Sequence, residues 1–118
     1  MLDEILVGSQ QDTEINLVYI VSYDLTNAAN EYAKINAILE GAGYSRDTSL
    51  GVDTIPENVF AGEKLQSHRP GEEATLLNKE SSRFLAEVIE IIDKEAPGKR
   101  KRLFVSVSKK DATSYRLE

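Results

Sequence analysis

The chain has 118 residues, 41% of them hydrophobic, with a formal net charge of −6 and no cysteine. This length fits one domain that buries about two-thirds of its unfolded surface. The absence of cysteine excludes disulfides, thiolate metal sites and thiol nucleophiles. No apolar run approaches the roughly 18 residues that cross a bilayer, so we expect a cytoplasmic protein without a membrane partner. The negative charge argues against a dedicated nucleic-acid binder, because phosphate contacts need cations.

Residues 16–24, Asn-Leu-Val-Tyr-Ile-Val-Ser-Tyr-Asp, predict a central strand. The run is rich in β-branched and aromatic residues and is almost continuously apolar, which is typical of a strand covered on both faces. One face carries Val18, Ile20 and Ser22, and the other carries Leu17, Tyr19, Val21 and Tyr23. A two-layer domain needs only one apolar sheet face. We therefore expect a homodimer in which Tyr19, Val21 and Tyr23 meet a second copy.

An amphipathic helix follows this strand. Thr26 or Asn27 can cap it, and Gly41 and Gly43 stop it. Apolar residues recur at spacings of three and four, which places them on one side of a helix. They are Ala28, Tyr32, Ile35, Leu39 and Ala42.

The middle of the chain predicts a hairpin and then a surface loop. Residues 44–54 carry a weak strand signal, broken by Gly51 and two aspartates, and residues 59–65 form a second short strand. The polar residues 66–80 contain the helix-breaking run His68-Arg69-Pro70-Gly71 and indicate a loop.

The last third predicts a helix over residues 81–95 and a strand over residues 102–108. The helix could begin as early as Glu72, since Leu76 and Leu77 extend its apolar stripe. The element order β-α-β-β-α-β is that of the α+β ferredoxin-like fold. It implies a four-stranded antiparallel sheet with two helices on one face. We expect a tail at 1–15, the domain at 16–110 with a loop insertion at 66–80, and a second tail at 111–118.

Asp24 is the first candidate for chemistry. It ends an apolar strand, a rigid place from which to project a functional group. In a dimer, two copies of Asp24 could hold Mg²⁺ and activate water toward a phosphodiester. Alternatively, Asp24 caps the following helix.

The cations of the last strand are the second candidate. Six of the 14 basic residues lie between residues 99 and 110, and they could hold a phosphate backbone. Alternatively, they keep an edge strand soluble. They are Lys99, Arg100, Lys101, Arg102, Lys109 and Lys110.

Three further sets of residues have side chains that suit binding or catalysis. Tyr19 and Tyr23 could stack on bases, although packing is the more common role of such residues. His68, the only histidine, could act as an acid or base or be merely solvated. Asp47, Asp53 and Glu57 could add metal ligands, but their spacing matches no calcium loop.

The segment Val18–Leu25, followed by Glu31–Lys34 and Ile38-Leu39, resembles the opening of small CRISPR-associated proteins of the Cas-two type and of their stand-alone bacterial relatives. Those families begin with a strand ending in Tyr-Asp-Leu or Phe-Asp and continue into an amphipathic helix. Pro56–Phe60 is similar to the turn before the third strand of the GhoS-type antitoxin endoribonuclease. The resemblance extends over residues 16–43 and beyond them concerns only the order of the elements.

This resemblance implies a ferredoxin-like homodimer. The aspartate linked to metal-dependent nuclease activity in the CRISPR-associated family corresponds to Asp24, with Mg²⁺ as the implied cofactor. Many members instead act as structural or nucleic-acid-binding dimers. The chain departs from the pattern in residues 26–31, which are neutral to acidic where the family often has basic residues. The polar segment 66–80 is a second departure.

Two hypotheses follow. The first is a dimeric protein associated with RNA or DNA, with a metal-dependent endoribonuclease activity that uses Asp24. The second is a non-enzymatic dimeric regulator, of the antitoxin or phage type, that binds a protein partner. The acidic region 57–95 and the net charge favour the second hypothesis.

Overall fold

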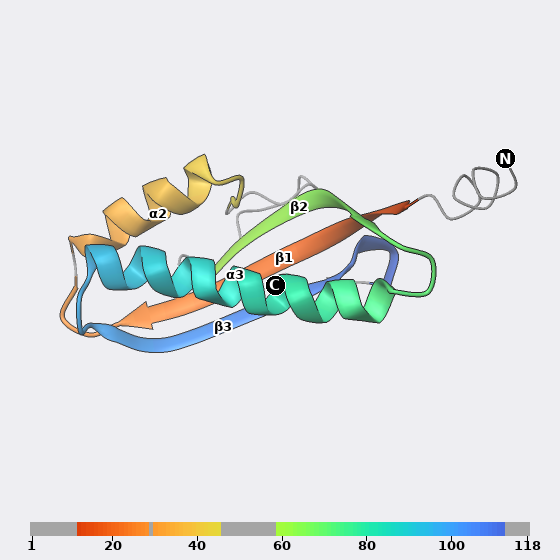
Figure 1. The fold of residues 1–118 in the computed structure, drawn as a ribbon. Coiled ribbons are helices and arrows are strands. Elements are labelled where there is room, and N and C mark those ends of the chain that lie inside the picture. Colours follow the sequence, from red (N-terminus) through yellow and green to blue (C-terminus); the bar gives the residue numbers. More distant parts are fainter. Residues whose placement is uncertain (1–11, 29, 46–58, 113–118) are drawn as a thin grey trace, which may run out of the picture.

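A long first strand lies at the centre of the fold. The computed structural model describes residues 12–28, 30–45 and 59–112. Within them the order is β1 (Thr13–Leu25), α2 (Glu31–Gly41), β2 (Val59–His68), α3 (Glu73–Glu95), β3 (Arg100–Lys109) and a 3-10 turn, η1 (Lys110–Ala112). Both other strands pair with β1 in antiparallel fashion, in the sheet order β2-β1-β3 (Figure 1).

The expected four-stranded ferredoxin-like sheet is wrong, because the described residues form a three-stranded sheet with two helices. Of the strand predicted over residues 44–54, only residues 44 and 45 lie in the described part of the chain. Only Ser45 forms a bridge, with Ala61 of β2, and residues 46–58 lie outside the described part of the chain. The α+β class and the central position of β1 are confirmed.

Both helices pack on the same face of this sheet (Figure 1). Because side chains alternate along a strand, β1 sends Leu17, Tyr19, Val21, Tyr23 and Leu25 toward the helices, where all five are buried. This placement corrects the predicted dimer interface. Tyr19, Val21 and Tyr23 are 0%, 0% and 2% exposed, so they belong to the core of a single chain and cannot meet a second copy.

The long helix α3 buries a stripe of residues spaced four apart: Glu80, Phe84, Val88 and Ile92. Its start at Glu73 confirms the earlier of the two predicted helix starts and shows that the loop insertion at 66–80 is wrong. Gln66 and His68 belong to β2, and only residues 69–72 connect the two elements. The polar composition of residues 66–80 favours a loop when the sequence is considered alone. In the structure many of these polar residues are exposed on β2 and α3, whereas Gln66 and Glu80 form a hydrogen bond with each other inside the fold.

Two smaller boundaries also differ from expectation. β1 begins at Thr13, within the predicted tail, because Thr13 still pairs with His68. Helix α2 begins at Glu31, and its N-cap, Asn30, forms no side-chain cap. Asn27 instead adopts a positive φ of 51° in the turn after β1. No helix in the described ranges is long and apolar enough to cross a membrane.

The opposite side of the sheet, which we call the outer face, has neither helix over it (Figure 1). The strand registers place on it fifteen side chains: Glu14, Asn16, Val18, Ile20, Ser22, Asp24, Val59, Ala61, Glu63, Leu65, Ser67, Arg102, Phe104, Ser106 and Ser108. Most are small. The two large apolar side chains of this face that are exposed, Phe104 and Leu65, are 61% and 56% exposed. They lie on different edge strands at opposite ends of the sheet.

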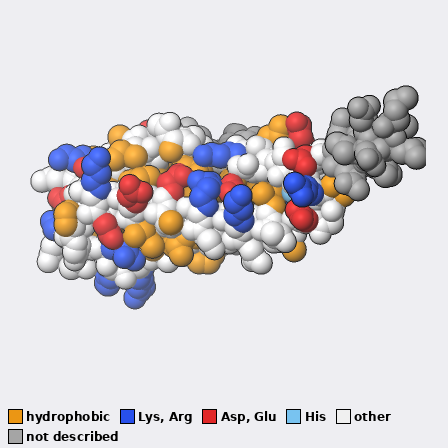
Figure 2. All heavy atoms as spheres, viewed as in Figure 1, with side chains coloured by type: hydrophobic (Ala, Val, Ile, Leu, Met, Phe, Trp, Pro, Cys, Tyr) orange, Lys and Arg blue, Asp and Glu red, His pale blue; other side chains and the backbone are white. Residues whose placement is uncertain are grey.

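Charge on the helix side is mixed. Figure 2 shows acidic and basic side chains interspersed over α3, with a group of basic side chains near the start of β3. The start of β3 carries Arg100, Lys101 and Arg102. The side chains of one sign therefore do not gather into one large area of this face.

Candidate functional site

Asp24 lies on the outer face at the end of β1, and its carboxylate is held in place from within the fold. The Tyr32 hydroxyl, on α2, donates to Asp24 Oδ1 over 2.9 Å, and the backbone N–H of Leu25 donates to the same oxygen over 3.1 Å. The Tyr32 hydroxyl also accepts from that N–H over 2.8 Å. Asp24 therefore fixes the turn after β1, and the alternative that it caps the following helix is wrong, because the N-cap of α2 is Asn30. Its other carboxylate oxygen has no hydrogen-bond donor among the described residues.

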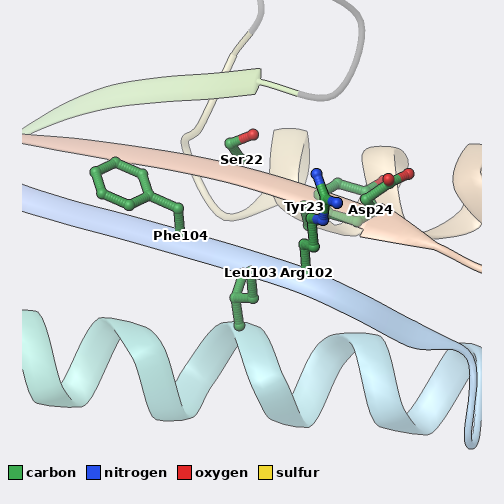
Figure 3. A pocket seen from close by; sticks show the side chains of 6 residues that line it. All are labelled: Ser22, Tyr23, Asp24, Arg102, Leu103 and Phe104. Atoms are coloured by element: carbon green, nitrogen blue, oxygen red, sulfur yellow. The ribbon is translucent and has the colours of Figure 1, made fainter.

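Four outer-face side chains form a square at this end of the sheet, which we call the Phe104 patch: Ser22, Asp24, Arg102 and Phe104. Ser22 is opposite Phe104 in the strand register, and Asp24 is opposite Arg102. A groove of about 320 Å³ runs between them. Figure 3 shows Leu103 pointing toward α3, whereas Phe104, Arg102 and Ser22 project to the other side. The patch thus combines an aromatic face, a cation, a hydroxyl and a carboxylate along one groove.

Arg102 and Asp24 are cross-strand neighbours of opposite charge, yet they form no ion pair. Such neighbours have Cβ atoms about 5 Å apart and normally attract each other. Here the hydrogen bonds from Tyr32 and Leu25 orient the carboxylate. As a result, the Arg102 guanidinium remains available to an anion from outside the chain.

The other predicted basic residues divide into two groups. Four form ion pairs that join the ends of β3 to neighbouring elements: Lys99 with Glu31, Arg100 with Asp93, Lys109 with Glu73 and Lys110 with Glu63. Hydrogen bonding to Glu73 raises the pKa of Lys109. Among the described residues, Lys101 and Arg102 make no ion pair. Of the six predicted cations, Arg102 is the best placed to hold a phosphate, because it lines the groove.

The contacts of the remaining candidate residues do not indicate a catalytic or binding role. His68 contacts the carbonyl oxygen of its neighbour Arg69 through Nδ1 over 2.8 Å and has no described acid or base beside it. Asp47, Asp53 and Glu57 lie outside the described residues. Tyr23 donates to Asn36 Oδ1 within the fold, and Tyr19 packs edge-on against Phe84 with ring centroids 5.3 Å apart. Both tyrosines pack in the core, which is their more common role, and neither offers a face to a base.

The donor set for Mg²⁺ is incomplete within one chain. In the described ranges no three of His, Cys, Asp and Glu gather closely enough to hold a metal. Asp24 alone offers one uncommitted oxygen, whereas Mg²⁺ in proteins takes one or two carboxylates and keeps several waters. The predicted magnesium site, shared between two copies of Asp24, therefore stays a prediction.

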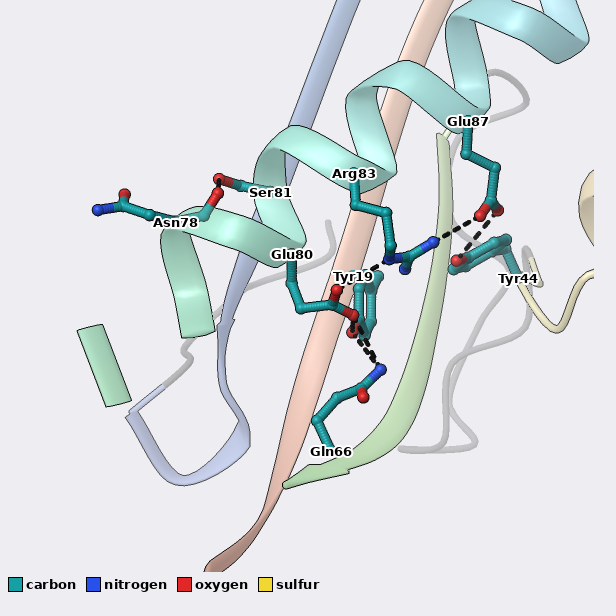
Figure 4. Close-up of polar contacts among 8 residues, drawn as sticks. All are labelled: Tyr19, Tyr44, Gln66, Asn78, Glu80, Ser81, Arg83 and Glu87. Carbon is teal, nitrogen blue, oxygen red and sulfur yellow. Dashed lines mark hydrogen bonds and ion pairs between the residues drawn. The ribbon is translucent and has the colours of Figure 1, made fainter. Parts of the chain in front are cut away.

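A buried polar network on the helix side of the sheet was not predicted (Figure 4). Glu80, only 5% exposed, accepts from the Tyr19 hydroxyl over 2.7 Å and from Gln66 Nε2 over 2.9 Å. Arg83 Nε donates to Glu80 over 2.8 Å, and Arg83 Nη1 donates to Glu87 over 2.7 Å. The network links β1, β2 and α3 and leaves the buried carboxylate fully partnered. The sequence feature that indicates this network is the position of Glu80, four residues before Phe84 on the buried stripe of α3.

The pKa values in this network follow from burial and hydrogen bonding. Burial, together with the hydrogen bond to Glu80, raises the pKa of Tyr19 to about 12. Burial alone would raise the pKa of Glu80, but hydrogen bonds from Arg83 and Tyr19 and the positive charge of Arg83 outweigh it, so the pKa lies below its ordinary value. Hydrogen bonding to Glu80 raises the pKa of Arg83. At neutral pH the network therefore holds a neutral tyrosine and an ionised Glu–Arg pair, with no group poised for proton transfer.

Sequence reasoning also missed Phe104. The alternation of Leu103, Val105 and Val107 toward the core marks Phe104 as the aromatic residue on the opposite face.

Compared with protein-family models, curated protein sequences and solved structures, the chain has no significant match.

Proposed function

We propose that this protein binds single-stranded nucleic acid, RNA foremost, at the Phe104 patch. The observation that carries the proposal is the Phe104 ring, 61% exposed and two residues along β3 from Arg102. Proteins that bind single strands on a sheet stack bases on exposed aromatic rings and hold the backbone with cations. The groove beside Phe104 has Arg102 on its wall, and the exposed Lys101 precedes Arg102 in β3.

The charge of the chain limits how strong this binding can be. A net charge of −6 repels a phosphate backbone at long range, and four of the six cations of the last strand are already paired. If Lys101 and Arg102 make the phosphate contacts, log K should fall with log salt with a slope of about −1.4. Most of the affinity then comes from stacking on Phe104.

Fluorescence anisotropy with a labelled RNA of about 12 nucleotides, within the range of known site sizes, tests the proposal. Phe104→Ala should weaken binding about 5- to 150-fold, since stacking is worth about 1–3 kcal/mol per base. The matched control is Leu65→Ala, which removes the other exposed apolar residue of the outer face at the far end of the sheet. For the cation, Arg102→Ala is compared with Arg100→Ala, because Arg100 is already paired with Asp93. Absence of binding at low salt, or equal effects of Phe104→Ala and Leu65→Ala, would rule the proposal out.

Cleavage of the bound RNA with Mg²⁺ is the catalytic form of this function that the sequence resemblance implies. Because one chain supplies Asp24 alone, it requires a homodimer that brings two copies of Asp24 together. The test incubates the protein with structured and single-stranded RNA, with Mg²⁺ or with a chelator, beside Asp24→Ala. Sedimentation gives the oligomeric state. Cleavage that persists in Asp24→Ala, or with the chelator, would refute this catalytic form.

A non-enzymatic regulator that binds a protein partner is the second candidate. It is favoured by the acidic net charge and by exposed Leu65, an apolar residue that nucleic acid does not require. It predicts that Leu65→Ala and Phe104→Ala both weaken partner binding and that labelled RNA and DNA fail to bind at low salt.

A further inference from the structure

We infer that the free edge of β3 pairs with β3 of a second copy of the chain, so that two three-stranded sheets join into one six-stranded sheet. The two strands run antiparallel, and Phe104 lies opposite the second copy's Phe104 on the outer face. This interface is separate from the proposed function, because it forms between two chains without nucleic acid. Three features support it: the backbone of β3, the apolar side chains beside its free edge, and the positions of its cations.

β3 is an edge strand that pairs with β1 on one side only (Figure 1). In an antiparallel pair, alternate residues direct both the N–H and the C=O toward the neighbouring strand, and the residues between them direct theirs to the other side. In the described part of the chain, the backbone of residues 101–107 forms hydrogen bonds with no element except β1. Such a row of unpaired backbone groups is a template for a further strand.

The core is incomplete along this edge. The apolar side chains that β3 directs toward the helices remain partly exposed: Leu103, Val105 and Val107. Their cross-strand neighbours on β1 are buried. Figure 4 shows Arg83 of α3 directed toward β2. Leu85 follows two residues later, a turn of about 200°, so it points to the flank of α3 that borders β3, where it is 37% exposed. A second sheet at this edge covers apolar groups that one chain leaves exposed.

The cations and Phe104 together favour one register. Like charges directly opposite each other on two strands are destabilising, whereas aromatic pairs are stabilising. A two-fold axis at Phe104, near the middle of β3, places Arg102 opposite the second copy's Ser106, and no cation faces another over residues 101–107. An axis one residue later would place Lys101 opposite Lys109. With the axis at Phe104, Arg102 is also a diagonal neighbour of the second copy's Phe104 ring, whose face attracts a cation.

This register joins the two Phe104 patches on the outer face. Ser22 and Phe104 of each copy form one row across the middle of the six-stranded sheet. The two copies of Asp24 lie on strands that are three strand spacings apart, at least about 14 Å. The edge-to-edge dimer therefore differs from the dimer that the catalytic form of the proposed function requires.

Sedimentation velocity of the full chain over a concentration series measures the association. One strand edge is a small interface, so we expect a dissociation constant in the micromolar range. Phe104→Lys should weaken dimerisation about 100-fold, because it removes the aromatic pair and places two cations opposite each other. The matched control is Leu65→Lys, which should leave the dimer unchanged, since Leu65 is similarly exposed on the outer face but belongs to the other edge strand.

Cross-linking tests the register. The chain contains no cysteine, so a single introduced cysteine can pair only with its own copy. Directly opposite residues in an antiparallel pair have Cα atoms about 4.5–5.5 Å apart, a distance that a disulfide spans. Under oxidation Phe104→Cys should therefore form a covalent dimer. Ser106→Cys should not, because in this register the two copies of residue 106 lie about 14 Å apart along the strands.

A chain that stays monomeric throughout the concentration series overturns the inference. So does a dimer that Leu65→Lys weakens as strongly as Phe104→Lys, because it would use the other edge of the sheet or another face. Efficient cross-linking of Ser106→Cys, with none for Phe104→Cys, overturns the register. Failure of the chain to bind RNA overturns the proposed function alone, because none of these measurements includes RNA.

Discussion

Truncation of Glu80 tests whether the buried network stabilises the fold. Glu80→Ala removes the acceptor of three hydrogen bonds, from the Tyr19 hydroxyl, Gln66 Nε2 and Arg83 Nε, at 2.7, 2.9 and 2.8 Å. The Tyr19 hydroxyl and Gln66 Nε2 each lose a buried acceptor, and each lost hydrogen bond costs about 1 kcal/mol or slightly more. The Arg83 side chain is 40% exposed and keeps its bond to Glu87, so it can rehydrate at small cost. The expected loss is about 2 kcal/mol or slightly more in the free energy of unfolding, below the range for a broken buried ion pair, because Gln66 Nε2 also donates to the Tyr19 hydroxyl.

Urea denaturation followed by circular dichroism measures this loss, with an unchanged m value as the sign of an unchanged unfolded state. Glu80→Gln keeps an acceptor for the Tyr19 hydroxyl but loses the charge that faces Arg83. Its expected cost is about 1.5 kcal/mol. Glu90→Ala is the control, because Glu90 is an exposed glutamate of the same helix and should change stability by less than about 0.5 kcal/mol. A loss below about 1 kcal/mol for Glu80→Ala would show that the network does not hold the helix to the sheet.

The same carboxylate gives the protein an acid-sensitive component of stability. The pKa of Glu80 is lower in the folded chain than its ordinary value of 4.5. A lowered folded-state pKa contributes stability above the unfolded-state pKa, and this contribution is lost as the pH falls through the folded-state value. We therefore expect unfolding free energy to decline below about pH 4.5, and to decline less steeply in Glu80→Gln. Parallel pH profiles for the two proteins would contradict the assigned role of Glu80.

Two further substitutions test close contacts around the sheet. Gly62→Ala should lower the free energy of unfolding by about 2 kcal/mol or more, because the added Cβ would lie 2.6 Å from the carbonyl oxygen of Gly43. The control is Gly41→Ala, whose added Cβ meets nothing within 4 Å and which should be neutral or slightly stabilising. Equal melting temperatures of the two variants would refute this reasoning. Tyr32→Phe removes the hydroxyl that contacts the Leu25 N–H and should cost about 1–2 kcal/mol. Thermal denaturation measures it, and a change below about 0.5 kcal/mol would mean that this hydroxyl does not fix the turn.

The central elements of the fold could be predicted from local patterns. The apolar run at 16–24 specified a central strand, because β-branched and aromatic residues in such a run have few other stable conformations. The spacing of Phe84, Val88 and Ile92 specified a helix for the same kind of reason. By contrast, residues 44–54 carried a weak and interrupted strand signal, and the four-stranded sheet that depended on it was wrong, because the described residues form a three-stranded sheet.

Polarity by itself could not separate an exposed position from a buried, partnered one. Gln66 and Glu80 were predicted to be loop residues, yet Gln66 donates a hydrogen bond to Glu80 inside the fold. Such a hydrogen bond forms only in the folded state, and it offsets the cost of burying a polar group. The same limit applied to the cations. The sequence counts six near the last strand but does not show that the ends of β3 lie beside acidic groups such as Glu73 and Asp93.

The sequence by itself determined that β1 is a central, almost continuously apolar strand and that Asp24 lies at its end. Only the tertiary structure decided which face the helices cover. They cover the face of Tyr19, Val21 and Tyr23, since these large side chains bury the most apolar area there. That choice leaves Asp24 on the outer face with Phe104. The candidate site follows from this geometry, because residues 24 and 104 come to the same face of the sheet only through strand pairing, which no local pattern encodes.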